Sequence, residues 1–379
     1  MKTKRRGQNE GSIFERKDGR WCGIISLGWR DGKRRRKAVY GSTAAEVQDK
    51  LTPLKSKKLS GLPIETDRRT VARFLVDWLA SVKSSVRVRT FEAYESTVNK
   101  HIVPQVGRMK LEKLGPQDVQ ALLDAKLASG LHPRTVTGIR LVLCYALNQA
   151  MRWELLSRNV AALVKGPKIP RREMKVWTED QARKFIECCD SERLGALYVL
   201  ALYTGLRRGE LCALRWSDVD LDTRVASVRR SLQRTRTAGL VFEEPKTEKA
   251  RRSINLAPAV ISALRAHRKR QAETRLAAGS LWQDKGLIFP TGIGTPMDPR
   301  ALGIDYDRMI EKSKLPRIRL HDLRHTFATI GLGQGVHPKV MSDMLGHSKV
   351  SLTLDVYSHA LPSFQTEASE KIAQALATK

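Results

Sequence analysis

The sequence predicts a multidomain α+β protein in three parts: a small three-stranded sheet with one helix, a helical domain, and a mainly α-helical domain with a small antiparallel sheet. Three observations favour this fold class. The chain has 379 residues, which is enough for two or three domains. Short strand-like stretches and turn residues fill the region before residue 42. Apolar residues recur at helical spacing from residue 70, and again after residue 178.

The chain is strongly basic. Lysine and arginine number 69 against 39 acidic residues, which gives a formal net charge of +30 and an isoelectric point of about 10.3. With 41% hydrophobic residues, this balance favours a folded protein that binds a polyanion, most often nucleic acid. Composition alone leaves a ribosome-associated protein or a membrane-surface binder as alternatives.

The sequence does not predict a membrane span, an export signal or a cross-linked framework. The longest apolar run, residues 194–206, is too short to cross a bilayer. The basic start of the chain is not followed by an apolar stretch, so it does not resemble a signal peptide. The scattered cysteines form no CxxC pair, which argues against a zinc site and against disulfides. They are Cys22, Cys144, Cys188, Cys189 and Cys212. We therefore expect a protein of the reducing cytoplasm.

Residues 1–62 form the first predicted domain, a basic sheet with one helix. Its strand-like stretches are residues 11–14, 21–27 and 34–40. Asp31-Gly32 indicates a hairpin turn between the last two strands. Ser42 followed by Glu46 indicates the start of a helix. A basic hairpin without a specific target is the alternative interpretation of this domain.

Residues 69–165 form the second predicted domain, which follows a polar linker at 63–68. Apolar side chains at helical spacing predict four helices, at about 70–82, 89–102, 116–129 and 133–151. The third of these starts at Pro116 and stops at Gly130, which matches the preference for proline first and glycine last. On its pattern alone, the domain is a helical bundle.

Residues 175–379 form the third predicted domain, after a basic linker at 165–175. Thr178 and Gln181 make a capping box, which predicts that the first helix of the domain starts there. The basic linker is suited to lie along phosphates, and a flexible linker without that role is the alternative.

Two further elements of the third domain are expected from the pattern. Strand-like residues 239–243 and 252–256 predict a hairpin with Lys246 near its tip. The tail, residues 361–379, predicts a terminal helix because its apolar residues have helical spacing. These apolar residues are Ile372, Ala375 and Leu376.

Several polar residues of the third domain are the types that cleavage of a phosphodiester requires. The reaction needs an in-line nucleophile, positive donors to the non-bridging oxygens, and an acid for the leaving oxygen. An arginine fork binds two phosphate oxygens at once, which a lysine does not do. The candidates are Arg207, Lys246, His321, Arg324, His347 and Tyr357. Taken singly, each has a plainer interpretation as a surface charge or a packed side chain.

The motifs around these candidates resemble the active site of the tyrosine recombinases, the phage integrase family. They are Thr-Gly-Leu-Arg-Arg-Gly-Glu-Leu at 204–211, His-Asp-Leu-Arg-His at 321–325, Leu-Gly-His at 345–347 and Asp-Val-Tyr-Ser-His at 355–359. The resemblance covers residues 178–359, and all six residue types occur in the order of the family.

The resemblance implies a role for each candidate that touches the phosphate. Arg207 and Arg324 would bind the scissile phosphate. His321 would donate a hydrogen bond and is a candidate base for Tyr357. His347 would be a further donor to the same phosphate.

The resemblance also implies the covalent chemistry. Tyr357 would be the nucleophile, and its attack would form a 3′-phosphotyrosine without a cofactor or a metal ion. Lys246 would be the general acid for the leaving 5′-hydroxyl, with Lys249 as its competitor. Glu210 would support Arg207 or its turn, and His325 would be structural.

By this resemblance the chain is a site-specific DNA recombinase, the integrase of a phage or another mobile element. Its partners would be double-stranded DNA attachment sites and three further copies of itself in a homotetramer, with a DNA-bending host factor and an excisionase as accessory proteins. The domains at 1–62, 69–165 and 175–379 would be the arm-type DNA-binding, core-binding and catalytic domains, working in the cytoplasm of a bacterial host. The tail would dock on a neighbouring subunit or pack on its own domain. The alternatives are a chromosome-dimer resolvase of the same fold and a catalytically inactive DNA-binding regulator.

Overall fold

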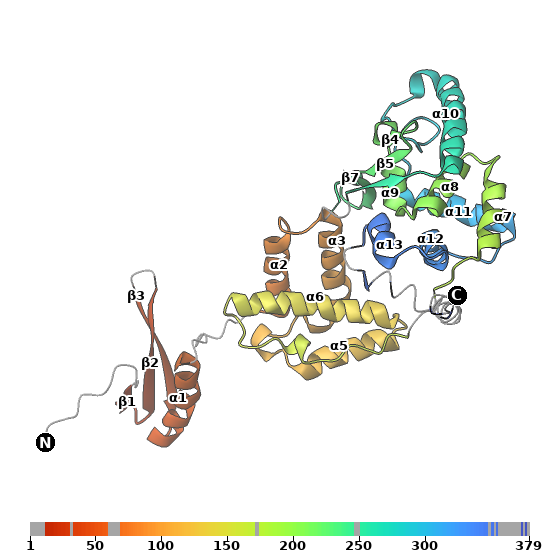
Figure 1. Ribbon diagram of the computed structural model, residues 1–379. Coiled ribbons are helices and arrows are strands. Elements are labelled where there is room, and N and C mark those ends of the chain that lie inside the picture. The colour runs from red at the N-terminus through yellow and green to blue at the C-terminus, as the bar shows by residue number, and fades with distance from the viewer. Residues whose placement is uncertain are drawn as a thin grey trace. The chain divides into compact units, whose positions relative to one another are not determined.

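The structure of the chain, a computed structural model, describes residues 12–30, 33–59, 69–170, 174–245 and 251–347 and the single positions 350, 351, 354, 373 and 376. The chain divides into two compact units, Met1–Pro170 and Arg171–Lys379. Figure 1 shows the helices and strands of each unit. The boundaries predicted for three domains remain a prediction, because they are not tested by this division into two units.

The first unit begins with an antiparallel sheet and one helix. The strands β1 (Ser12–Glu15), β2 (Trp21–Arg30) and β3 (Lys33–Gly41) lie in that order, and α1 (Ala44–Leu59) follows them. The helix packs on the sheet through the buried side chains of Ile25, Val47 and Leu51. The prediction of three strands and a helix is confirmed, while the turn predicted at Asp31-Gly32 lies outside the described residues.

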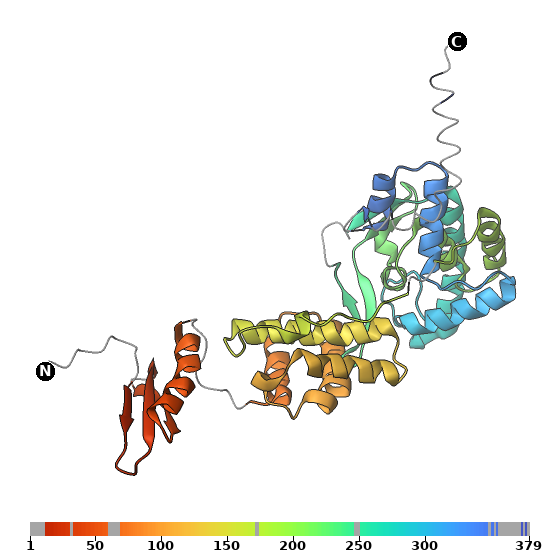
Figure 2. The same cartoon turned by 90° about the horizontal axis from the view of Figure 1, so that it is seen from below.

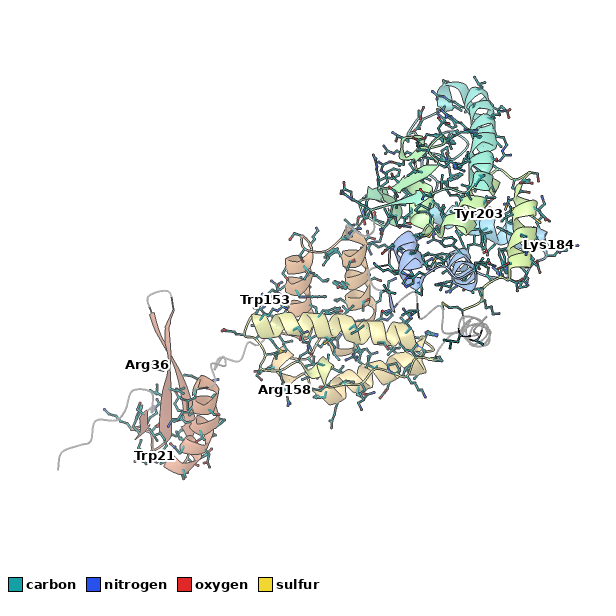
Figure 3. All side chains as sticks on the ribbon, in the orientation of Figure 1. Trp21, Arg36, Trp153, Arg158, Lys184 and Tyr203 are labelled. Carbon is teal, nitrogen blue, oxygen red and sulfur yellow. The ribbon has the colours of Figure 1, made fainter. Side chains whose placement is uncertain are left out.

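The rest of the first unit is helical, as predicted. Its elements are α2 (Val71–Val82), α3 (Val88–Thr97), the π-helix η1 (Val98–Ile102), α4 (Val103–Val106), η2 (Leu111–Lys113), α5 (Pro116–Ala128), α6 (Pro133–Arg152) and η3 (Val160–Ala162). Large side chains such as Phe74 and Trp78 fill its core. Trp153, labelled in Figure 3, places its ring edge-on to that of Phe74, with the ring centroids 6.1 Å apart.

The second predicted helix of this unit is less regular than expected. The sequence pattern predicts one helix over 89–102, but residues 98–102 are π-helical and the helix continues through α4. The N–H of Val103 donates to the carbonyl of Val98, which lies five residues back. Pro104 follows directly and has no N–H for an α-helical bond. A shift of the helical hydrogen bonds beside this proline accounts for the π-turn.

The second unit is mainly helical, with two small sheets (Figure 2). Its helices are α7 (Glu179–Cys189), α8 (Gly195–Thr204), α9 (Arg208–Ala213), η4 (Trp216–Asp218), α10 (Pro258–Ala278), η6 (Gly279–Leu281), α11 (Pro299–Ser313), α12 (Asp322–Gly333) and α13 (Pro338–Leu345). Its strands are β4 (Val219–Asp220), β5 (Val225–Val228), β6 (Ser231–Thr235), β7 (Gly239–Glu243) and β8 (Arg252–Asn255). With the observed sheets, the predicted multidomain α+β fold class is confirmed.

Helix α8 forms the centre of this unit. It is the apolar run that the sequence shows at 194–206, and it packs against α7, α10 and α12. Tyr203, labelled in Figure 3, is 37% exposed, whereas every other residue of α8 is buried. The run is therefore a core helix. None of the described helices is long and apolar enough to cross a lipid bilayer.

Two contacts of Trp177 hold the start of this unit in place. Its backbone N–H donates to the hydroxyl of Thr326 in α12 at 3.2 Å, and its indole N–H donates to the carbonyl of Pro316 at 2.9 Å. Directly after it, Thr178 caps α7 by accepting from the N–H of Gln181 at 3.3 Å. The Gln181 side chain accepts from the N–H of Thr178 at 3.1 Å, which confirms the predicted capping box.

The predicted hairpin of residues 239–243 and 252–256 is wrong. β7 pairs with β6, whereas β8 pairs with β5 in a separate sheet of order β4-β5-β8. A tight turn joins β6 to β7: the hydroxyl of Thr235 accepts from the N–H of Ala238, and Gly239 has a φ of 66°. This turn gives β7 a partner close in sequence, so β8 is left to pair with β5.

Candidate active site

Arg207 is positioned by a sharp turn at the end of α8. Gly205 ends this helix in the left-handed region with a φ of 61°, which glycine adopts at little cost. A Cβ at this position would lie 2.7 Å from side-chain atoms of both Leu345 and Phe327. The chain then enters α9, with Arg207 as the N-cap residue. Only a glycine therefore lets the end of α8 approach α12 and α13 so closely.

Glu210 holds the side chain and the backbone of Arg207 together. Its carboxylate accepts from the backbone N–H of Arg207 at 3.0 Å and from the guanidinium Nη1 at 2.8 Å. The Nη2 group of Arg207 donates to the carbonyl of Gly346 at 3.0 Å. The arginine side chain is 38% exposed, whereas that of Glu210 is 8% exposed. The prediction that Glu210 supports Arg207 or its turn is confirmed, since it does both.

Arg252 is a second partner of Glu210, and the sequence analysis missed it. Its Nη2 group donates to the Glu210 carboxylate at 2.9 Å, and its side chain is 6% exposed. Burial raises the pKa of Glu210, but the cationic Arg252 and Arg207 more than offset this and lower it below its ordinary value. A buried glutamate between two arginines therefore stays ionised.

Arg324 lies inside the protein on α12 and is 4% exposed. Its Nη1 group donates to the carbonyl of Gly205 and its Nη2 group to the carbonyl of Leu345, both at 2.7 Å. Desolvation, followed by the charge of Arg207, lowers the pKa of Arg324 to about 9. The guanidinium therefore remains a cation at neutral pH.

His321 stands at the start of α12 and is exposed, and its ring meets that of His325 edge-on at 5.1 Å. Although the residue as a whole is exposed, desolvation of its ring and then the charges of His325 and Arg324 lower the pKa of His321. The same helix start is fixed by Asp322, which accepts two side-chain hydrogen bonds from Arg319, at 2.7 and 2.9 Å. His321 is therefore held in a neutral state on a rigid helix end.

His347 directly follows the end of α13. Gly346 adopts the left-handed region with a φ of 63°, and the N–H of His347 donates to the carbonyl of Ser342 at 3.0 Å. The helix thus ends on a glycine C-cap. Desolvation, and then the charges of Arg324 and Arg207, lower the pKa of His347 to about 4. The imidazole is half-buried and neutral at pH 7.

The described structure brings part of the predicted set together. Arg207, Arg324 and His347 meet at the C-terminal end of α13, although they come from three different elements. His321 is the N-cap residue of α12, the helix that carries Arg324 three residues later. Lys246 and Tyr357 lie outside the described residues, as does Lys249, the alternative to Lys246. Within the described part of the chain, the missed residue is Arg252. The signal that could have identified Arg252 is the burial of Glu210, because a buried carboxylate requires cationic partners.

Comparisons with known proteins place the chain in a family. Residues 175–363 match the phage integrase family, and residues 70–127 match the N-terminal SAM-like domain of phage integrases. An integrase of Streptomyces ambofaciens is 31% identical, over 97% of this chain and 96% of its own length.

Solved structures show the same fold at lower identity. The Tn1549 transposon integrase in complex with transposon right-end DNA has a TM-score of 0.69 and 23% identity, over 80% of this chain and 99% of its own. A lambda integrase tetramer bound to a Holliday junction has a TM-score of 0.57 and 17% identity, over 93% of this chain and 96% of its own. The sequence match to the streptomycete integrase extends over nearly the whole length of both proteins. The residues that meet at the end of α13 lie within the motifs at 204–211, 321–325 and 345–347. The chain therefore belongs to the phage integrase family and is a tyrosine-type site-specific recombinase.

Proposed function

We propose that this recombinase is the integrase of a phage or another mobile element, and that Arg207, Arg324 and His347 hold the scissile phosphate. The carrying observation is their convergence on the end of α13. The two guanidinium groups donate to the neighbouring carbonyls of Gly346 and Leu345, at 3.0 and 2.7 Å. Two arginine forks at one place supply the donors that a phosphoryl group with developing charge requires.

The reaction would run through Tyr357. Its hydroxyl oxygen attacks the scissile phosphorus while the bond from phosphorus to the 5′ oxygen breaks. His321 accepts the phenolic proton, and Lys246, or Lys249 in its place, gives a proton to the departing 5′ oxygen. The 3′-phosphotyrosine conserves the ester bond, so attack by a 5′-hydroxyl reverses the step without ATP. The roles of Tyr357 and the lysines rest on the sequence motifs.

The protonation states of the described groups support these roles. A lowered pKa keeps His321 neutral at pH 7, which is the form that accepts a proton. His347, with a pKa of about 4, is also neutral and is a hydrogen-bond donor through one ring nitrogen. The arginines supply the positive charge, since Arg324 is ionised below a pKa of about 9.

We also propose the organisation of the complex with DNA. Residues 1–62 would bind arm-type sites, residues 69–165 the core site, and residues 175–379 would carry the chemistry. The match of residues 70–127 to the N-terminal domain of phage integrases and the net charge of +30 support this division. Four copies would act on two duplexes, as the tetrameric lambda integrase on its junction suggests. A DNA-bending host factor and an excisionase complete the proposal, which places the protein in the bacterial cytoplasm beside the nucleoid.

The experiment is covalent trapping on a nicked duplex that carries the attachment site mapped from DNA flanking the coding gene. Wild type should form a protein–DNA adduct, and Tyr357→Phe should bind the same duplex without forming one. Arg207→Gln should bind but lose adduct formation by roughly 100–1,000-fold, because a preorganised donor to the phosphate is removed. Binding by wild type without any adduct would overturn the proposal and favour a catalytically inactive regulator.

A further inference from the structure

The end of α13 accepts hydrogen bonds from three arginines that come from different segments of the chain. The last carbonyls of a helix have no partner within the helix and carry its partial negative charge, so cationic donors stabilise them. Here three successive carbonyls are each served by a separate guanidinium. The pairs are Arg252 Nε to Met344 O at 2.7 Å, Arg324 Nη2 to Leu345 O at 2.7 Å, and Arg207 Nη2 to Gly346 O at 3.0 Å.

Arg252 is buried, as Arg324 is, whereas the side chain of Arg207 is 38% exposed. The side chain of Arg252 is 6% exposed, and its guanidinium spans two acceptors that are far apart in sequence. The Nε group donates to the carbonyl of Met344, while Nη2 donates to the carboxylate of Glu210 at 2.9 Å. Through Glu210, which also binds Arg207, this one side chain links the end of α13 to the start of α9.

The guanidinium of Arg252 also packs against the peptide that precedes His347. A Cβ on Gly346 would lie 3.0 Å from Nη1 and 3.2 Å from Cδ of Arg252. The absence of a side chain on Gly346 thus has a second reason besides its positive φ. Any displacement of Arg252 changes the surface on which the backbone of His347 rests.

We propose that Arg252 is a positioning residue of the recombinase: it clamps the end of α13 to Glu210 and so fixes His347 relative to Arg207. This inference rests on the proposed function for its effect on cleavage. A merely structural ion pair is the competing explanation. The two explanations differ in the rate of adduct formation per folded molecule. Loss of positioning lowers this rate, whereas loss of a merely structural ion pair lowers only the fraction of protein that is folded.

The test compares Arg252→Met and Arg252→Lys with wild type in single-turnover adduct formation on the nicked attachment-site duplex at saturating DNA. Rates are taken per folded molecule, well below the unfolding temperature of each variant. We expect both variants to slow adduct formation about 10–100-fold, because a displacement on the order of 1 Å has that effect, while duplex binding changes less than about threefold. Lysine should not rescue the rate, because one ammonium does not reproduce the two directions of the guanidinium fork. If Arg252→Met does not fold, the lysine variant carries the test.

Arg230→Met is the matched control. Arg230 forms a comparable ion pair in the same unit, at 2.9 Å from Asp218, whose side chain is 1% exposed. We expect this variant to lose stability and yet keep its rate per folded molecule within about twofold, because the ion-pair partner of Arg230 is Asp218 of η4 and not the end of α13. Rates of the Arg252 variants that match wild type after correction for folding would overturn the proposal.

A measurement without DNA separates this inference from the proposed function. Desolvation and then the charges of Arg324 and Arg207 do most to lower the pKa of His347, with a smaller contribution from Arg252; in the free protein, Arg252→Met should therefore raise this pKa slightly, and Arg230→Met should leave it unchanged. Arg252→Lys retains the charge, so a shifted His347 resonance in that variant reports displacement. If wild type forms no adduct but the His347 resonance is shifted in Arg252→Lys, the proposed function fails while the positioning survives. If adducts form and the His347 resonances do not move, the positioning fails alone.

Discussion

Glu210 is the carboxylate that pairs with two arginines of the described site, Arg207 and Arg252. Its carboxylate binds the guanidinium groups of Arg207 and Arg252 at 2.8 and 2.9 Å, and it is almost completely shielded from water. An ion pair in such surroundings costs desolvation free energy on forming. Removal of one partner is still more costly, because it leaves a buried charge without compensation.

Glu210→Gln should therefore destabilise the protein by about 3 kcal/mol, because the buried Arg252 loses its countercharge. In a unit of this size, the unfolding midpoint should fall by roughly 6–12 °C. The control is Glu244→Gln, whose carboxylate is 77% exposed and paired with Arg251. That variant should change stability by less than about 1 kcal/mol, as surface ion pairs do. Equal midpoints in thermal scans of the two variants would contradict this expectation.

The protonation of His347 should make stability depend on pH. Its pKa is about 4 in the folded protein against an ordinary 6.5, so the unfolded chain binds more protons between these values. Its contribution is present above its ordinary pKa of 6.5 and is lost as the pH falls through that value toward 4. An NMR titration, with the resonance assigned by His347→Gln, should show a midpoint well below 6. A midpoint at 6.5 or above would disprove the shift.

At the scale of single residues, the short sequence motifs identified most of the described candidate site residues. Arg207, Arg324 and His347 could be named from the sequence because each lies in a short pattern with a helix end beside it. Arg252 could not, since its importance depends on the pairing of β8 and on contacts to residues 42 and 92 positions away. The motif at 321–325 also does not indicate that His321 is exposed at the helix start while Arg324 is buried.

Among the elements, the ends of helices decide the geometry of the site. α8 and α13 both finish on a glycine in the left-handed region, at Gly205 and Gly346. Each glycine is followed within two residues by a candidate site residue, Arg207 or His347. Both helix ends also expose carbonyls that Arg324 binds, at Gly205 and Leu345. The two turns are therefore joined through one buried guanidinium.

Gly205→Ala should be strongly destabilising. The left-handed conformation costs about 1–2 kcal/mol for a residue with a Cβ, and the contacts at 2.7 Å with Leu345 and Phe327 add about 1–3 kcal/mol of overpacking. Gly239→Ala is the control, since Gly239 has a φ of 66° but nothing within 4 Å of its Cβ position. It should show the conformational cost alone. Thermal unfolding of both variants measures the difference, and equal losses would mean that the packing around Gly205 is not tight.

Element prediction succeeded where the pattern was local. The capping box at Thr178 and the helices with regular apolar spacing are set by neighbours within a few residues. The hairpin of residues 239–243 and 252–256 failed because strand pairing depends on which edge is free, and the turn before Gly239 had already given β7 its partner. The π-turn at 98–102 was missed because the apolar spacing continues smoothly through it.

For the whole molecule, charge was the most useful property to read from the sequence. The net charge of +30 by itself favours a polyanionic partner, and the family match agrees with this. The arrangement of the domains on DNA could not be predicted in this way, because amino-acid composition does not indicate which surfaces of each domain contact a duplex.

Binding to an attachment-site duplex should be steeply salt-dependent. If six to ten phosphates are neutralised, the affinity should fall by about 10³–10⁵-fold between 50 and 200 mM salt, because condensed counterions are released on binding. Titrations at several salt concentrations give the slope of log affinity against log salt. A slope near zero would show that the positive charge is not used on the DNA backbone.

The two hydrogen bonds of Trp177 help to determine where the second unit receives a mechanical load. A pull along residues 165–175 would reach Met174, which packs against Ala328, Leu332, Met341 and Leu345, and then the buried indole of Trp177. One connection from Trp177 to α12 is the hydrogen bond to Thr326, one turn along that helix from Asp322 and two residues beyond Arg324. Tension in the linker is thus transmitted to the helix of the buried arginine, and Pro316 shares the anchoring.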